Sequence, residues 1–227
     1  MFNFVKLPEL DFDLESITTE FGRRYITPSG EKYPSVTTIL SSYNKDAIME
    51  WRNAVGEKEA NKISGRAARR GTRLHKLCED YVNGNLGELQ RQMMMPFDKM
   101  MFRQVKKLLD ENLNNIYCQE QALYSDRLKI AGRVDCIAEW KGKLSIIDYK
   151  SSTKIKDERY IENYFMQCTA YSEMFLDLTG KEIDDIIVLI ATEEEVPQVF
   201  EKKKFDYLER LNKYISNYSM SMVEKAG

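Results

Sequence analysis

The segment from residue 130 to 150 constrains the fold of this chain more than any other. Two runs rich in β-branched residues flank Lys141-Gly142, a dipeptide suited to a tight turn. If the loop has two or four residues, Asp135 in the first strand lies directly opposite Asp148 in the second, whereas an odd-length loop would break this register. The segment therefore predicts an antiparallel hairpin with two carboxylates facing one another.

Charge is concentrated on one face of this expected hairpin. Side chains alternate along a strand, so Lys150 shares a face with Asp148, and opposed residues such as Asp135 share it too. The neighbouring residues are apolar: Val134, Ile137, Ile146 and Ile147. In a central strand pair, like charges need compensation, and a divalent cation would supply it. Carboxylate oxygens suit Mg²⁺ or Mn²⁺ better than zinc. The alternative is a surface hairpin with solvated charges.

The remaining pattern predicts an α/β (α+β) fold with a central mixed sheet flanked by helices. Residues 1–34 contain a turn and short strands, and Ser35 is a candidate cap for a short helix from Val36. Helices are expected at 46–62, 65–83, 97–114, 157–178 and 203–222, and strands at 116–125, 130–140, 143–150, 185–191 and 196–200.

Composition excludes several classes of protein. The chain has 227 residues, 43% hydrophobic and 31% charged, without the run of about 20 apolar residues that a membrane helix needs. Its net charge of −2 does not favour general duplex coating, so a nucleic-acid contact requires a local basic patch. No leader peptide is evident, and a cytoplasmic location is expected. Four dispersed cysteines favour neither disulfides nor a zinc or iron–sulfur site: Cys78, Cys118, Cys136 and Cys168.

The expected helix at 65–83 carries a second set of candidate residues. His75, the only histidine, and Glu79 stand four residues apart on one helical face. A single imidazole suits either a structural role or an additional ligand to a metal held mainly by carboxylates. The same helix carries a basic stripe: Arg66, Arg69, Arg70 and Arg73. This stripe could follow the phosphates of a nucleic acid, or it could be a solvated helix face.

A third pair of candidates lies on the expected helix after Lys150. Gln167 and Tyr171 are also four residues apart, within an amphipathic pattern typical of a core-facing helix. Tyr171 is equally suited to stacking on a base, and Gln167 to holding a phosphate or orienting Lys150.

These residues together resemble the PD-(D/E)xK nuclease superfamily, in particular its branch with a G-x-x-x-H motif. Gly71-Thr-Arg-Leu-His75 matches that motif, Asp135 the first acidic position, Asp148-Tyr-Lys150 the D-x-K motif, and Gln167-x-x-x-Tyr171 the Q-x-x-x-Y motif. The four motifs occur in the expected order. The branch includes the nuclease domain of bacterial recombination helicase–nucleases.

The resemblance extends upstream, so that it covers roughly residues 33–175. Tyr33-Pro-Ser-Val-Thr-Thr-Ile-Leu40 and Trp51-Arg52 look like the N-terminal region of the mitochondrial genome maintenance exonuclease family and related phage exonucleases, and Glu120 also fits. A transit peptide and the cysteine set of the iron–sulfur nucleases are both lacking, which favours a phage or bacterial protein.

The resemblance implies a restriction-endonuclease-like nuclease core at 65–227, after an N-terminal extension and helical arch at 1–64. It implies an exonuclease that degrades single-stranded DNA from its ends with one or two Mg²⁺ or Mn²⁺ ions and no zinc or iron–sulfur cluster, in phage or bacterial DNA processing. A helicase, a recombinase and a single-strand-binding protein are candidate partners. The alternatives are a structure-selective endonuclease on the same fold and a non-catalytic nucleic-acid-binding protein.

Residue roles follow from the same resemblance. Asp135, Asp148 and Lys150 are the expected catalytic residues, and His75, Asp135 and Asp148 the expected metal ligands. Supporting roles fall to Glu79, Glu120, Gln167 and Tyr171. The candidate DNA contacts are Trp51, Arg52, Arg66, Arg69, Arg70 and Arg73.

Overall fold

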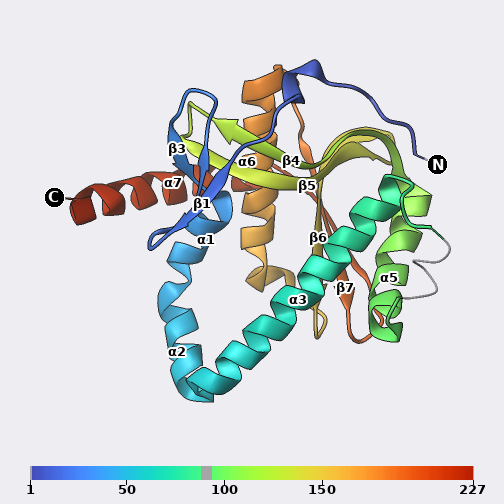
Figure 1. The fold of residues 1–227 in the computed structure, drawn as a ribbon, viewed down its shortest axis with the longest axis horizontal. Helices are drawn as coiled ribbons and strands as arrows, with labels where there is room; N and C mark the ends of the chain where they lie inside the picture. The colour runs from blue at the N-terminus through green and yellow to red at the C-terminus, as the bar shows by residue number, and fades with distance from the viewer. Residues whose placement is uncertain (1, 88–93, 227) are drawn as a thin grey trace.

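A five-stranded mixed sheet forms the centre of the molecule (Figure 1). The computed structural model describes residues 2–87 and 94–226. The strands lie in the order β4 (Leu113–Ser125), β5 (Ile130–Trp140), β6 (Lys143–Ser152), β7 (Asp185–Thr192) and β8 (Gln198–Lys203). Only β6 and β7 are parallel among these neighbours. The expected fold class is confirmed.

The single parallel pair follows from the connections along the chain. Tight turns join β4 to β5 and β5 to β6, but α6 (Glu162–Thr179) lies between β6 and β7 and makes the crossover that a parallel pair requires. Residues on all sides of α6 are buried, including Phe165, Cys168 and Phe175, because it packs on the sheet and against α7 (Phe205–Ala226). The short turn η2 (Glu158–Tyr160) precedes α6.

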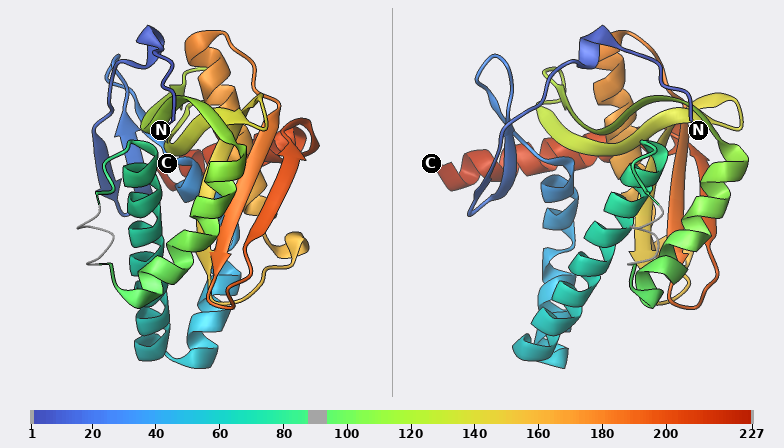
Figure 2. Two further views of the ribbon diagram at one scale, coloured as in Figure 1. Left: turned by 90° about the vertical axis from the view of Figure 1, so that its right-hand side faces the viewer. Right: turned by 45° about the vertical axis from the view of Figure 1, so that its right-hand side comes forward.

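Two other helices cover the opposite face of the sheet (Figure 2). They are α3 (Glu57–Val82) and α5 (Pro96–Asn112). Leu74 and Cys78 of α3 and Val105 of α5 share an apolar core with Ile147 and Tyr149 of β6. No helix in the described parts of the chain is both long and apolar enough to cross a membrane.

The N-terminal residues form a small antiparallel sheet of their own. After the turn η1 (Pro8–Leu10), it contains β1 (Ser16–Thr19), β2 (Gly22–Ile26) and β3 (Lys32–Pro34). Tyr25 and Tyr33 pack on Ala122 of β4 and Ala131 of β5. This contact places the small sheet beside the large one. The next helix, α1 (Val36–Tyr43), is capped by the Ser35 hydroxyl, which accepts the Thr38 N–H at 3.1 Å as predicted.

The following helices divide at a different residue from the one expected. Instead of ending at 62 and restarting at 65, the chain forms α2 (Lys45–Val55) and a continuous α3 from Glu57. The break is at Gly56, whose φ of +84° is accessible to glycine at little cost. The boundary expected between residues 64 and 65 falls inside α3. Figure 1 shows α2 and the first half of α3 projecting together from the sheet.

Candidate active site

The β5–β6 hairpin has the predicted register. Its loop is Lys141-Gly142, and both residues have the positive φ of a tight hairpin turn. Backbone pairing runs from Trp140 opposite Lys143 to Cys136 opposite Ile147. The same register continued by one residue brings Asp135 opposite Asp148.

The regular backbone pairing ends at Cys136, and beyond it the Asp135 side chain forms the next hydrogen bond between the two strands. Its Oδ2 accepts a hydrogen bond from the backbone N–H of Tyr149 at 2.8 Å. The Asp135 carboxylate is therefore held between β5 and β6 by the backbone itself. Because the two strands no longer pair regularly beyond Cys136, residues from the α3 side of the sheet can reach this carboxylate.

His75 of α3 makes that approach. Its Nδ1 lies 3.3 Å from Oδ1 of Asp135 and 4.0 Å from Oε1 of Glu120. The ligand atoms of these three residues all lie within 4.8 Å of one another. The ring of His75 meets the ring of Tyr149 edge to face, with centroids 6.1 Å apart. This contact fixes the imidazole beside the carboxylates.

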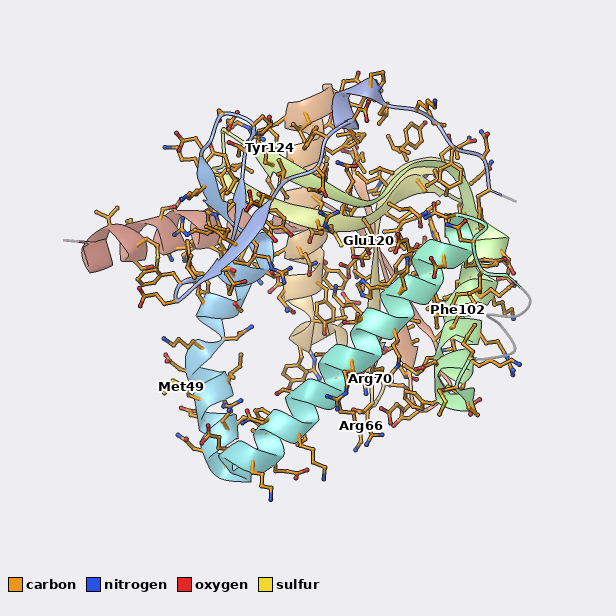
Figure 3. The ribbon with its side chains drawn as sticks, viewed as in Figure 1. Met49, Arg66, Arg70, Phe102, Glu120 and Tyr124 are labelled. Carbon is orange, nitrogen blue, oxygen red and sulfur yellow. The ribbon has the colours of Figure 1, made fainter. Side chains whose placement is uncertain are left out.

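Glu120, for which the sequence predicts a supporting role, is one of the three residues of this cluster. It lies opposite Asp135 across β4 and β5, between the paired residues Gln119 and Gln121. Its φ is +47°, a left-handed backbone that costs energy for a residue with a side chain. Such strain is typical of functional sites. A strand pattern in the sequence gives no sign of it. Figure 3 shows Glu120 between the sheet and the C-terminal half of α3.

Asp148 and Lys150 lie next to this three-residue cluster, and Asp148 is not part of it. The Lys150 ammonium forms an ion pair with Asp148 and lies 5.1 Å from the ring centroid of Tyr164 on α6. Asp148 is fully buried, and apart from that ammonium its oxygens have no donor among the described residues. A buried carboxylate with so few partners fits a site that a cation completes.

The charges of the cluster shift one another's pKa values. Burial alone would lower the pKa of His75, but the Asp135 carboxylate outweighs it and raises that pKa to about 9. Burial would raise the pKa of Asp135, yet His75 and Lys150 hold it below its usual value. Burial, reinforced by the charge of Asp135, raises the pKa of Glu120 to about 7 and that of Asp148 to about 6. The positive side chains nearby, including His75 and Lys150, therefore do not offset the effect of burial at Glu120 and Asp148.

The cluster opens into a cleft of about 510 Å³. The cleft is lined by Arg23, Gly71, Thr72, His75, Lys76, Glu79 and Glu120. Glu79 lines the cleft together with His75, with which it is expected to share a helical face, and its carboxylate is 3.2 Å from the Lys76 ammonium. It is therefore not a member of the three-residue cluster.

Tyr171 belongs to the core, and Gln167 is half-buried beside it. Tyr171 is only 2% exposed, so it is not available to stack on a base. Gln167 donates a hydrogen bond to its hydroxyl at 3.0 Å. A Cβ at Gly132 would lie 2.8 Å from Cε1 of Tyr171. The position of the Tyr171 ring therefore requires a glycine at residue 132, three positions before Asp135.

Most of the expected basic stripe is paired with carboxylates. Arg70 is buried, and its guanidinium lies 2.5 Å from the Glu193 carboxylate. Arg66 lies 3.6 Å from the same carboxylate, and Arg73 is 2.8 Å from Asp98. Figure 3 shows Arg66 and Arg70 on α3. Of the other candidate contacts, Arg69 is exposed, Trp51 is 37% exposed, and Arg52 donates to Asn61.

The sequence model of the PD-(D/E)XK nuclease superfamily matches residues 48–218. The chain belongs to this superfamily. The matched region contains His75, Glu120, Asp135, Asp148 and Lys150. The resemblance carried by the four sequence motifs is thereby confirmed, and the protein is a nuclease-superfamily member whose relatives use divalent metal ions.

Individual relatives match shorter stretches of this chain. An ATP-dependent helicase/nuclease subunit from Clostridium beijerinckii is 32% identical over 77 residues, which are 33% of this chain and 6% of that protein. Mitochondrial genome maintenance exonuclease 1 of Homo sapiens is 26% identical over 149 residues, 61% of this chain and 42% of that protein. This chain thus spans less than half of either relative. A crystal structure from Eubacterium rectale aligns over 69% of this chain and 70% of its own, at 12% identity and a TM-score of 0.42.

Proposed function

We propose that this PD-(D/E)XK nuclease is an exonuclease that degrades single-stranded DNA from its ends with Mg²⁺ or Mn²⁺. The observation that carries the proposal is the convergence of two carboxylates and one imidazole within 4.8 Å at an open cleft, beside the Asp148–Lys150 ion pair. Similarity to a protein named as an exonuclease supports attack from strand ends.

The donor set fits a hard divalent cation. Asp135 and Glu120 supply oxygen ligands and His75 a nitrogen, a combination that suits Mn²⁺ and Mg²⁺. Asp148, a ligand expected from the sequence, would complete the set from the neighbouring strand. A bound divalent cation supplies a water of lowered pKa and polarises the scissile phosphate.

The protein's own residues would do the rest of the chemistry. Lys150 keeps its charge because Asp148 and Asp135 raise the pKa of its ammonium despite burial. That fixed positive charge is suited to orienting the attacking water and to stabilising negative charge on the phosphoryl oxygens. The backbone N–H of Tyr149 holds Asp135 in one orientation, so the site is preorganised.

Single-stranded DNA is the substrate that two side chains on the projecting helix α2 support. Trp51 and Arg52 lie on α2, which shares a turn at Gly56 with the helix that carries His75. An exposed aromatic ring beside a guanidinium can stack on unpaired bases and bind the adjoining phosphates. Paired bases in a duplex do not present those faces.

One gel tests this function. Linear strands labelled at either end and a covalently closed single-stranded circle are incubated with and without Mg²⁺. We expect the linear strands to be lost only with Mg²⁺ and the circle to resist. Rapid cutting of the circle would instead support a structure-selective endonuclease, and no loss of any strand would support a non-catalytic binding protein.

The Asp148→Ala variant tests the site itself. Removing this carboxylate takes away a proposed cation ligand and the partner of Lys150, so we expect degradation to fall by at least about a thousandfold. Strand binding in Ca²⁺ should persist, because the outer surface of the cleft is unchanged. Hydrolysis at the wild-type rate by the purified variant would contradict the metal assignment.

A further inference from the structure

The cleft contains one cationic side chain from outside the region that matches the nuclease family. It is Arg23 of β2, in the small N-terminal sheet, and it lines the same cleft as His75 and Glu120. We propose that Arg23 binds a phosphate of the substrate strand next to the scissile one, so that the small sheet forms one wall of the substrate site. This inference rests on the proposed function.

The backbone of Arg23 is fixed to the beginning of α1. Its N–H donates to the Thr38 hydroxyl at 3.1 Å, and its carbonyl accepts the Ser35 N–H at 2.9 Å. The preceding residue, Gly22, has a φ of +104°, and a Cβ there would lie 2.5 Å from the Thr38 side chain. The strand is therefore held tightly against α1 at this point. The backbone of Arg23, from which its side chain extends, therefore has a fixed position relative to α1.

The same strand is anchored on the large sheet two residues later. Tyr25 is buried against Ala122 of β4 and Ala131 of β5. Because side chains alternate along a strand, Arg23 shares the face of Tyr25 but extends past that contact toward the cleft. Arg24 is on the other face, where its guanidinium donates to the Lys32 carbonyl at 3.1 Å.

The charge of Arg23 is uncompensated. Within residues 2–87 and 94–226, its guanidinium has no hydrogen-bond or ion-pair partner. The other cation of the cleft, Lys76, is held by Glu79 at 3.2 Å and Asp80 at 2.9 Å. An arginine is always charged and forms paired hydrogen bonds to two oxygens of one phosphate. A phosphodiester that passes through the cleft is the ligand which matches this free guanidinium.

Strand binding measures this contact directly. Fluorescence anisotropy of a labelled oligothymidylate, with Ca²⁺ in place of Mg²⁺, should show about tenfold weaker binding by Arg23→Gln at low salt. The slope of log affinity against log salt should become shallower by about 0.7, the value for one lost phosphate contact on a single strand. With Mg²⁺, KM should rise while kcat is unchanged. Arg24→Gln, which removes the neighbouring guanidinium from the opposite face, should match the wild type.

A scan with neutral methylphosphonates locates the phosphate. Replacing one phosphate at a time should weaken wild-type binding at the contacted position and leave Arg23→Gln unaffected there. Equal binding by Arg23→Gln and Arg24→Gln, or a fall in kcat with affinity unchanged, would overturn the inference. Thermal unfolding of both variants checks that they are folded. Failure of the proposed function is a separate result, because it appears as a wild-type protein that leaves the strands intact in Mg²⁺.

Discussion

Glu120 combines a strained backbone conformation with a shifted side-chain pKa. Its left-handed backbone places a half-buried carboxylate beside Asp135, and burial together with that charge raises its pKa to about 7. The Glu120 carboxyl therefore binds its proton more tightly in the folded protein than in the unfolded chain, where its pKa is 4.5. The stabilising contribution is full at low pH and is lost as the pH rises through about 7. Without metal, an ionised Glu120 destabilises the fold.

We therefore expect Glu120→Gln to stabilise the metal-free protein at pH 8 and to have little effect at pH 5. Allowing for partial exposure, the gain is about 1–2 kcal/mol, or roughly 2–8 °C in Tm. Thermal unfolding in EDTA at the two pH values measures it. Glu79→Gln is the matched control, since that carboxylate faces the same cleft but is paired with Lys76. An equal gain in both variants would show that general charge reduction is responsible.

Tyr164 is a residue that sequence motifs did not single out. Its ring lies 5.1 Å from the Lys150 ammonium, which is also paired with Asp148. A cation–π contact of this kind is worth about 0.5–2 kcal/mol and restricts where the ammonium lies. We expect Tyr164→Leu to lower kcat by about tenfold with KM unchanged, and Tyr164→Phe to restore it because the ring remains. Steady-state kinetics with saturating Mg²⁺ decides this, and equal losses in both variants would assign the effect to the hydroxyl.

At the scale of elements, the sequence was sufficient where one local signal settled the geometry. The Lys141-Gly142 turn and strand alternation fixed the β5–β6 register, and Ser35 marked the start of α1. The division of α2 from α3 was wrong because Gly56 and Gly65 are both candidates for a break. A helix tolerates an interior glycine at about 1 kcal/mol, so composition alone did not show which one ends it.

The side-chain contacts between packed elements could not be predicted from the sequence either. Pairing of Arg70 with Glu193 joins α3 to the residue after β7, and no spacing along the chain predicts that contact. The positive φ of Glu120 has the same origin, because tertiary context imposes it. Expectations about the basic stripe therefore concerned the helix alone, and not the carboxylates packed against it.

The contact between β5 and α6 gives a prediction at this scale. A Cβ at Gly132 would approach Tyr171 to 2.8 Å, so Gly132→Ala should overpack this interface and destabilise the protein by about 1–3 kcal/mol. Adding Tyr171→Leu should recover part of that loss, since the smaller side chain vacates the ring's position. Urea unfolding of the two single variants and the double variant gives the coupling energy. Strict additivity would mean that the two residues do not clash.

For the whole molecule, the three-residue cluster joins a helix to two neighbouring strands of the sheet. His75 is on α3, Glu120 on β4 and Asp135 on β5, so a bound cation would link the helical layer to the sheet. A ligand that binds only the folded state stabilises it by about 2.7 kcal/mol at a concentration of a hundred times Kd. Mn²⁺ should therefore raise Tm by roughly 5–11 °C for a chain of this size.

The Asp135→Asn variant should lose this shift, because the amide keeps the shape of the side chain but not its charge. Asp13→Asn is the control, since it also removes one acidic charge, from an exposed carboxylate paired with Arg133 at 2.6 Å and outside the cluster. Hydrogen exchange with and without Mn²⁺ gives a second readout: protection should increase in both α3 and β4 of the wild type. An increase confined to one of them would mean that the ion does not bridge the layers, and an equal Tm shift in Asp135→Asn would place the cation elsewhere.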